Sequence, residues 1–395
     1  MSRGPIVAGV GMTPFVSPSL GRPYTDLAGE AIRAALTDAG ISYGQVQQVF
    51  AGYVYGDSTS GQRAVYSTGM TGIPIFNVNN NCATGSTALY LARQAVEAGA
   101  ADCVLVVGFE QMRRGAIAEQ YGDRPGPLEQ FVELVDRRYP GEEGPLALKL
   151  FGGAARDYAQ RYGTPSEIFA AITVKSRLHA AENPLALFRD PVTLDEVLSS
   201  PRLFDPLTRL QCCPPTCGGA AAVIVSEKFA RRNGLSGSIR IKAQSMTTDV
   251  PSSFDGDMVQ AVGAGMTAAA AREVYESSGV DPRDIPVVEL HDCFTCNEVI
   301  SYEALGLVEE GGAEKMIRDR DNTYGGRCVT NPSGGLLSKG HPLGATGLAQ
   351  CYELVQQLRG QSGSRQVSGA RLALAHNIGL GGACVVTLYE QTDAR

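Results

Sequence analysis

Tryptophan is absent from the 395-residue sequence, and histidine occurs only four times. No segment approaches the roughly 20 consecutive apolar residues that a helix needs to cross a bilayer, so we expect no membrane span. The N-terminal sequence MSRGPIVAGVGMTPF lacks the layout of a signal peptide, and the C-terminal QTDAR is not an SKL-type peroxisomal address. The sequence therefore predicts a cytoplasmic protein.

An excess of positive charge is also lacking. The formal net charge is −7 and the pI is near 5.3, which gives the whole protein no attraction to nucleic acid or to anionic lipid. We expect no nucleic-acid partner, and an anionic ligand would need a local basic patch or helix N-termini.

The ten cysteines do not form the framework of a small disulfide-rich domain. They are scattered through apolar or glycine-rich sequence, which predicts free thiols in a reducing compartment. Cys212, Cys213 and Cys217 do cluster, but no CxxC pair or nearby histidine completes a tetrahedral zinc set. We therefore expect no metal site.

Strand and helix patterns alternate along the chain, which is typical of an α/β fold. A strand is expected at 6–11, and a helix with Thr25 as its cap at about 25–39. Apolar residues recur at helical spacing over about 82–99. The continuous apolar run at 103–109 predicts a parallel strand that is buried on both faces.

Residues from about 111 to 215 interrupt this alternation. They carry charged and Pro/Gly-rich sequence such as GDRPGPLEQ and RRYPGEEGP, with helices expected near 149–162 and 165–181. We interpret the segment as an inserted loop domain that covers a site.

The opening pattern then recurs. A helix at 266–280 and a strand at 285–292 repeat the first helix and its following strand, and a later helix and the strand at 371–377 repeat the second pair. The sequence thus predicts two similar α/β halves, 1–235 and 236–395, that share one site between them.

Cys82 is the strongest candidate nucleophile. It lies in NNNCATGSTAL (79–89), after a polar turn and at the start of an apolar helix, where peptide dipoles should favour its thiolate. Its small neighbours leave room for a substrate. A buried structural cysteine is an equally good interpretation of this segment alone, but the histidine and glycine motifs described next favour the nucleophile.

Three of the four histidines stand in glycine- or cysteine-rich junctions after predicted strands: His291, His341 and His376. Ligand sites of open α/β sheets gather at the ends of strands, which favours a functional role. The alternative for each is a structural histidine bonded to a backbone carbonyl. His179 lies in the charged insertion and is expected at the surface.

Two further motifs complete the candidate site. HDCFTCNE places Cys293 beside His291 as a second thiol able to exchange a proton, whereas Cys296 could instead face the core. AHNIGLGGAC offers backbone N–H groups for an oxyanion hole. It lacks the GxGxxG spacing of a nucleotide-binding loop.

These groups suit acyl-thioester transfer. Cys82 would attack a carbonyl carbon, and His341 would accept the thiol proton. Cys293 would exchange a proton with the α-carbon, while His291 would hold the thioester oxygen of the enolate. The backbone N–H groups of Cys82 and Gly379 would hold the oxyanion.

The motifs NNNCATGSTAL, HDCFTCNE, NPSGGLLSKGHPLGATGLAQ and HNIGLGGACVVTLYE, in this order, resemble the thiolase superfamily and specifically its sterol carrier protein x-type members. The resemblance implies the five-layered αβαβα thiolase fold, a homodimer or larger homo-oligomer, 3-oxoacyl-CoA substrates and coenzyme A as co-substrate, with no permanently bound cofactor. In this subgroup the acid/base thiol sits in the HDCF loop, which supports Cys293. His376 and Asn377 stand in the last loop, where other thiolases keep a catalytic cysteine.

The expected reaction is the reversible CoA-dependent cleavage of 3-oxoacyl-CoA to acyl-CoA plus acetyl-CoA or propionyl-CoA, in the degradation of fatty acids or sterol side chains. The sequence departs from the family where Ser-Asp-Gly-Ala-Ala often stands, since it has Cys217-Gly218-Gly219-Ala220 there. It also shows no trailing sterol-carrier domain, so we expect no lipid transfer by this chain alone. The alternatives are a retro-aldolase acting on side-chain CoA thioesters, a non-catalytic lipid-binding protein and a ketoacyl synthase.

Overall fold

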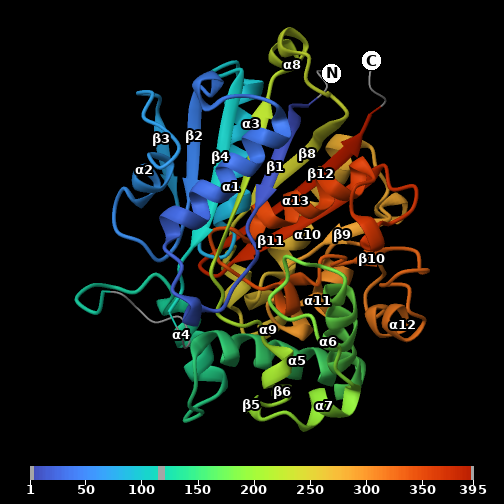
Figure 1. Cartoon of the computed structure of the whole chain (residues 1–395). Helices are drawn as coiled ribbons and strands as arrows, with labels where there is room; N and C mark the ends of the chain where they lie inside the picture. Colours follow the sequence, from blue (N-terminus) through green and yellow to red (C-terminus); the bar gives the residue numbers. More distant parts are fainter. Residues whose placement is uncertain (1–3, 114–120, 393–395) are drawn as a thin grey trace.

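The computed structural model describes residues 4–113 and 121–392, and its strands run through the centre of the molecule (Figure 1). Residues 114–120 of the expected insertion, and the outermost residues of the two terminal segments used above to predict location, lie outside the described residues. Within the described residues, ten strands form one sheet in the order β10-β9-β11-β12-β8-β1-β7-β4-β2-β3. The N-terminal five are β1 (Ile6–Met12), β2 (Gln48–Gly52), β3 (Ile75–Val78), β4 (Cys103–Glu110) and β7 (Gly218–Val225).

The C-terminal five strands follow the same order as the N-terminal five. In chain order they are β8 (Ile239–Thr247), β9 (Val287–Glu289), β10 (Val329–Thr330), β11 (Leu372–Gly379) and β12 (Ala383–Gln391). In each set the third strand stands at the outer edge, followed by the second, fourth, fifth and first. β1 and β8 meet at Ile6 and Arg240, so the two first strands join the sets. This topology accounts for the recurrence seen in the sequence.

Helices arrange these strands into five layers. α1 (Tyr24–Ala39) covers the outer face of the first set, and α10 (Ala264–Ser278) covers the outer face of the second. α3 (Thr84–Glu97) and α13 (Thr346–Arg359) pack against each other and contact strands of both sets. The described part of the chain therefore confirms the αβαβα layering.

Local sequence explains the long elements. α1 buries Leu27, Ile32 and Leu36 on one face, and Gly40 ends it with φ +70°, a conformation that favours glycine. The expected cap at Thr25 is wrong: extended Pro23 precedes the helix, and the Thr25 hydroxyl bonds to Asp26 instead of to a free amide. β4 is buried at every position, as its continuous apolar run predicted.

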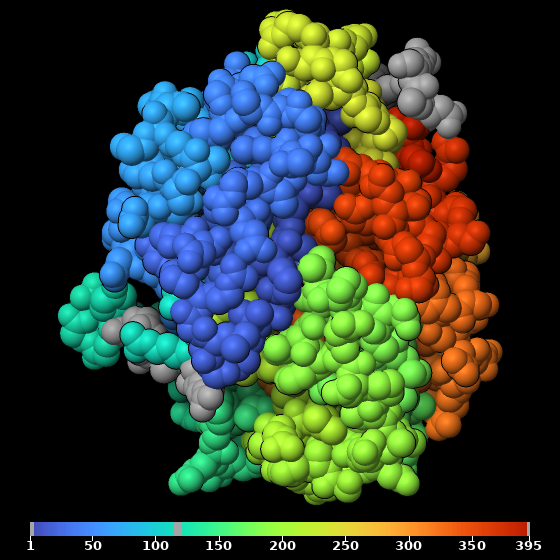
Figure 2. Space-filling view, in the orientation of Figure 1, coloured from blue at the N-terminus to red at the C-terminus, as the bar shows by residue number. Residues whose placement is uncertain are grey.

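The described part of the chain between β4 and β7, residues 121–217 above all, forms a mostly helical layer below both halves (Figures 1 and 2). It contains α4 (Glu129–Arg138), α5 (Leu146–Tyr162), α6 (Ser166–Ala181), α7 (Leu194–Ser199), β5 (Arg202–Phe204) and β6 (Leu207–Thr208). The sequence predicted α5 and α6 but not α4, nor the short β3 and α2 (Ser60–Val65) of the first half. The other α-helices of the described residues are α8 (Glu227–Asn233), α9 (Met258–Ala261), α11 (Thr295–Ala304) and α12 (Ala313–Arg318).

The prediction that His179 lies at the surface is wrong. Its side chain is 3% exposed, with Nδ1 2.9 Å from the Asn331 carbonyl oxygen and Nε2 2.7 Å from Thr323 Oγ1. The charges of the insertion suggested a solvated helix, but α6 packs against the second half through polar side chains. Lys175 and Ser176 of the same helix are also buried and hydrogen-bonded there.

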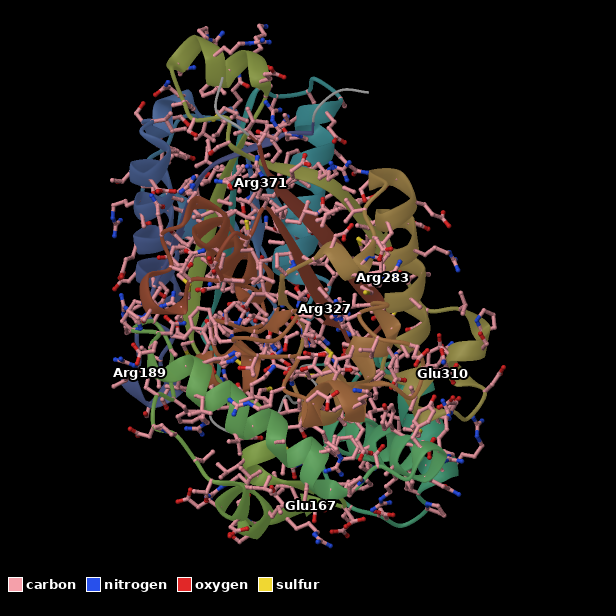
Figure 3. All side chains as sticks on the ribbon, turned by 90° about the vertical axis from the view of Figure 1, so that its right-hand side faces the viewer. Glu167, Arg189, Arg283, Glu310, Arg327 and Arg371 are labelled. Carbon is pink, nitrogen blue, oxygen red and sulfur yellow. The ribbon has the colours of Figure 1, made fainter. Side chains whose placement is uncertain are left out.

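Many charged side chains outside α6 are exposed to solvent. Figure 3 labels six exposed examples on helices and loops around the sheet: Glu167, Arg189, Arg283, Glu310, Arg327 and Arg371. None of the helices within 4–113 and 121–392 combines the length and apolar character that crossing a bilayer would require.

Candidate active site

A cavity of about 400 Å³ lies where the two halves and the insertion meet. Cys82, His291, Cys293 and His341 all line it. These residues come from segments up to 259 positions apart, since Cys82 precedes α3 and His341 precedes α13. Apolar side chains form much of the remaining wall: Met112, Leu128, Leu146, Leu148, Phe151, Leu203, Leu343, Ile378 and Leu380.

The loop carrying Cys82 is held by its own polar residues. Thr84 Oγ1 donates to the Asn81 carbonyl at 2.6 Å and accepts the Asn80 N–H at 2.9 Å. Asn81 has φ +51° and donates from Nδ2 to the carbonyl of Leu380 at 3.2 Å. The polar turn therefore fixes Cys82 two residues before the first turn of α3.

The expectation of a stabilised thiolate at Cys82 is wrong for this structure. Burial, with a smaller contribution from the nearby Glu110 carboxylate, raises the pKa of the Cys82 thiol to about 12. Cys82 is 7% exposed and stands outside the helix, so loss of hydration outweighs the helix dipole. We therefore expect the Cys82 thiol to be protonated at neutral pH.

His341 presents a free lone pair to the same pocket. Its Nδ1 lies 2.7 Å from Thr346 Oγ1, and that hydroxyl donates its own hydrogen to the Pro342 carbonyl at 2.9 Å. Thr346 must then accept from His341 Nδ1–H, so Nε2 carries no hydrogen. Nε2 is buried and has no hydrogen-bond partner. Burial lowers the pKa of His341 to about 3, which keeps the ring neutral.

His291 carries its ring hydrogen on the other nitrogen from His341. Asn377 Nδ2 donates to His291 Nδ1 at 2.9 Å, and Ser86 Oγ donates to Asn377 Oδ1 at 3.0 Å. The His291 hydrogen therefore resides on Nε2. Burial lowers the pKa of His291 well below its usual value, with His341 and His376 adding to the effect. The site thus contains one imidazole acceptor and one imidazole donor.

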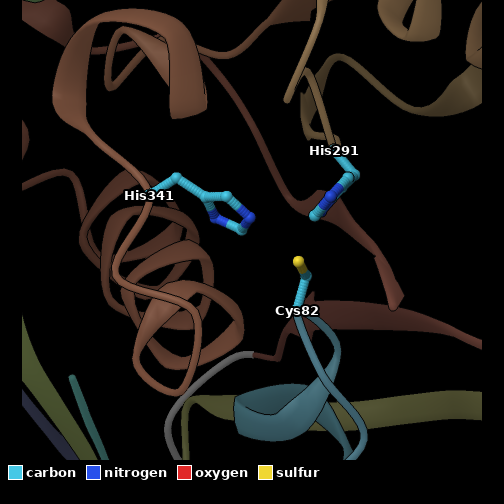
Figure 4. Close-up of side chains that lie close together, drawn as sticks. All are labelled: Cys82, His291 and His341. Atoms are coloured by element: carbon cyan, nitrogen blue, oxygen red, sulfur yellow. The ribbon is translucent and has the colours of Figure 1, made fainter. Parts of the chain in front are cut away.

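The two rings face each other across the thiol (Figure 4). Their centroids are 5.1 Å apart and their planes are nearly perpendicular. The ligand atoms of Cys82, His291 and His341 all lie within 4.8 Å of one another. This spacing suits proton transfer between the thiol and His341, followed by stabilisation of an adjacent oxygen by His291.

His376 and Gly379 do not line the cavity, and neither does Asn377. His376 Nδ1 accepts the His291 backbone N–H at 3.5 Å, and its Nε2 lies 2.9 Å from Thr267 Oγ1. His376 therefore lies behind His291. A side chain at Gly379 would bring its Cβ within 2.1 Å of the Asn80 carbonyl oxygen, so glycine lets β11 approach the Cys82 loop.

The two cysteines of HDCFTCNE face different surroundings. Cys293 lines the cavity, and burial together with the Cys213 and Cys82 thiols raises its pKa well above its usual value. Cys296 is fully buried on α11, and its thiol donates to the Phe151 carbonyl at 3.1 Å. Cys293 is thus the thiol of this motif that can reach a ligand.

Glu110 belongs to the site, although the sequence analysis missed it. Its carboxylate accepts the N–H groups of Val54, Tyr55 and Gly344 at 3.0–3.1 Å. It thereby links the Cys82 half to the loop that carries His341. Burial raises its pKa to about 7. An acidic residue ending the apolar run CVLVVGFE was the available signal.

Cys212 and Cys213 line the cavity wall, while the Cys217 thiol donates to the Met112 carbonyl at 3.5 Å. Among the described residues, the group that could hold a metal ion is instead Cys82, His291 and His341. The hydrogen on His291 Nε2 opposes this use, because a coordinating nitrogen must be unprotonated.

The departure at Gly218 has a steric explanation. A Cβ at Gly218 would lie 2.3 Å from Phe15 Cδ1, so any side chain at this position would require the Phe15 ring to move. A Cβ at Gly219 would lie 2.5 Å from the Leu27 carbonyl oxygen. The two glycines allow β7 to begin close against neighbouring segments.

Comparison with known proteins identifies the family of the chain. Residues 6–228 match the model of the thiolase N-terminal domain, and residues 256–389 match that of the thiolase C-terminal domain-like family. The chain is 54% identical to sterol carrier protein 2 of Homo sapiens over 393 residues, which covers 98% of this chain and 72% of that protein. It is 35% identical to the benzoylsuccinyl-CoA thiolase subunit BbsB of Thauera aromatica, over 96% of each chain.

Solved structures show the same fold. The Ltp2-ChsH2(DUF35) aldolase superposes with a TM-score of 0.83 at 27% identity, covering 98% of each chain. Human mitochondrial 3-ketoacyl-CoA thiolase in complex with CoA superposes with a TM-score of 0.74 at 19% identity, covering 99% of this chain and 98% of that one. The chain belongs to the thiolase family of acyltransferases.

Proposed function

We propose that the protein catalyses the reversible CoA-dependent cleavage of 3-oxoacyl-CoA to a shortened acyl-CoA plus acetyl-CoA or propionyl-CoA. The observation that carries the proposal is the Cys82 thiol beside the free Nε2 lone pair of His341 and the N–H of His291, within an apolar cavity. Thiolytic cleavage needs a nucleophile, a base and a donor for a developing enolate at one point.

The first step would form the acyl-enzyme. Cys82 Sγ attacks the 3-oxo carbon while its proton passes to His341 Nε2, because both groups start neutral. In this step the backbone N–H of Cys82 would hold the oxyanion, whereas Gly379, which we expected to share this role, does not line the cavity. The C2–C3 bond then breaks, and its electron pair forms a thioester enolate whose oxygen accepts from His291 Nε2–H.

The second step would release the products. Cys293, whose raised pKa keeps it protonated, gives its proton to the enolate carbon. The thiol of coenzyme A then gives its proton to the Cys293 thiolate and attacks the acyl-Cys82 carbonyl. Cys82 Sγ leaves and takes back its proton from His341 Nε2, so all three groups return to their starting states. Reversal of these steps joins two acyl groups, so the direction depends on the concentrations of substrates and products.

The cavity wall supports an apolar acyl group. Leu146, Leu148 and Phe151 of the insertion line it, opposite Ile378 and Leu380 of the second half. Burial of such a group in an apolar cavity contributes roughly 0.8 kcal/mol for each methylene. This lining supports a place in the degradation of fatty acids or sterol side chains.

A retro-aldolase is the second candidate, because an aldolase is among the structures that resemble this chain. Retro-aldol cleavage needs a base and an enolate donor but no covalent thioester. The intact Cys82, with a histidine lone pair in reach, favours the thiolase reaction. A non-catalytic lipid-binding role leaves the acceptor and donor states of the two histidines unexplained.

The test follows loss of the 3-oxoacyl-CoA enolate absorbance on addition of CoA, with short, medium and 2-methyl-branched substrates. We expect cleavage by the wild type and none by folded Cys82→Ala. Cleavage that persists in Cys82→Ala, or that requires no CoA, would favour the aldolase reaction.

We also propose a homodimer or larger homo-oligomer. β3 is the last strand of the sheet on its side, and Phe76 on this strand is 46% exposed, so a second copy could cover this edge. Sedimentation of the wild type should give at least twice the chain mass of 41.7 kDa, and a species of single-chain mass at micromolar concentration would contradict the proposal.

A further inference from the structure

We propose that the buried ion pair between Glu289 and Lys339 positions His291 and His341 relative to each other. The two partners occupy matching places in the sequence. Glu289 ends β9 two residues before His291, and Lys339 stands two residues before His341. The pair therefore joins the two segments that deliver the imidazoles to the thiol.

The pair is deeply buried. Glu289 is 0% exposed and Lys339 is 1% exposed, with Nζ 3.2 Å from Oε2. Removing two charges from water costs several kcal/mol for each ion before their attraction offsets it. Apolar residues of similar volume would often stabilise such a place equally well. The burial of this pair thus points to a role in fixing the positions of the two segments that it joins.

The carboxylates around His291 hold the turn that leads to His341. Glu289 also accepts the Ser333 N–H at 3.0 Å and the Ser333 hydroxyl at 2.7 Å. Asp292, directly after His291, accepts the Leu336 N–H at 2.7 Å.

The turn itself is fitted closely to Asp292. Gly335 has φ +60°, and a Cβ there would lie 2.1 Å from Asp292 Oδ2, so no side chain fits between the two segments. The contacts of Glu289 and Asp292 thus fix residues 333–339 against both sides of the His291 position.

Loss of the pair should move His341 relative to Cys82 without removing any group that touches the substrate. A misplacement of about 1 Å can reduce a rate by roughly 100-fold. The effect should appear mainly in kcat, because the apolar wall that binds the acyl group stays in place.

The test uses Glu289→Gln, Lys339→Met and the double variant. Two quantities are measured: the rate at which iodoacetamide labels Cys82 across pH, read by mass spectrometry of its peptide, and kcat and KM for cleavage. We expect each single variant to lower kcat by about 10- to 100-fold with KM changed by less than about threefold. The pH dependence of Cys82 labelling by iodoacetamide should shift in both single variants. The double variant should lose less than the product of the single losses, because no charge is left unpaired.

Glu353→Gln is the matched control. Glu353 forms a buried pair with Arg365 at 3.0 Å and does not line the cavity. It should reduce thermal stability while leaving the labelling profile and kcat near wild type. If Glu353→Gln lowers kcat as much as Glu289→Gln at equal stability, or if folded Glu289→Gln keeps both quantities within twofold, the positioning role is overturned.

Should Glu289→Gln not fold, Ser333→Ala takes its place, since it removes only one donor to the Glu289 carboxylate and should shift the labelling profile in the same direction. An unchanged profile in Ser333→Ala and in Lys339→Met would equally overturn the proposal. The kcat measurement rests on the proposed function, but thiol labelling does not. Absence of cleavage by the wild type would count against the proposed function alone, and the labelling rates would still decide the positioning role.

Discussion

Replacing Thr346 with valine should weaken catalysis by disturbing the tautomer of His341. The hydroxyl accepts from His341 Nδ1–H at 2.7 Å and donates to the Pro342 carbonyl at 2.9 Å. Valine keeps the shape of the threonine side chain but removes both hydrogen bonds. The Nδ1–H is then buried without a hydrogen-bond partner, so the tautomer with the hydrogen on Nδ1 is no longer favoured over the tautomer with the hydrogen on Nε2.

The magnitude follows from the buried donor. An unsatisfied buried group costs about 1–3 kcal/mol, and each 1.36 kcal/mol is tenfold in rate. We therefore expect kcat/KM for 3-oxoacyl-CoA cleavage to fall by about 5- to 150-fold. Labelling of Cys82 by iodoacetamide at neutral pH should slow as well, since fewer molecules offer the thiol an acceptor.

The control is Thr173→Val. Thr173 is also buried, and its hydroxyl donates to the Leu210 carbonyl at 3.0 Å, away from the histidines. Thr173→Val should lower the stability of the protein but leave kcat/KM near the wild-type value. If folded Thr346→Val retains kcat/KM within twofold, Thr346 does not set the state of His341 and the assignment of its lone pair is wrong.

Two further changes test other parts of the site. Burial raises the pKa of Glu110 from 4.5 to about 7. The stability that Glu110 contributes is therefore complete below about pH 4.5, and it declines by about 3 kcal/mol as pH rises through 7. Urea unfolding of Glu110→Gln should lack this part of the pH dependence, and an unchanged dependence of unfolding free energy on pH between 5 and 8 would contradict the burial effect. Cys293→Ala should still acylate Cys82 but should no longer exchange the α-hydrogens of acetyl-CoA with deuterated water, whereas retained exchange would assign the acid/base role to another group.

The sequence was most informative where a pattern has a single physical cause. The apolar run of β4 and the capped periodicity of α1 follow from burial and from Gly40, so both elements were predicted closely. The motifs also predicted Cys82 and His341 as site residues, and the fold places both in one cavity. Short elements such as β3 were missed because tertiary pairing, and not local propensity, forms them.

Properties that arise from three-dimensional packing could not be read from the sequence. The helix-dipole argument predicted a low thiol pKa at Cys82, but burial and Glu110 reverse the direction. The charged insertion suggested an exposed His179, although its partners 144 and 152 residues away bury it. The tautomers of His291 and His341 likewise depend on partners that only the fold supplies.

The most direct test of the central claim is the mass of the protein after brief incubation with 3-oxoacyl-CoA in the absence of free CoA. A covalent thioester predicts an adduct equal to the shortened acyl group, located on the peptide that contains Cys82, and its loss when CoA is added. Cleavage of the substrate with no adduct on Cys82, under conditions that trap thioesters, would contradict the account.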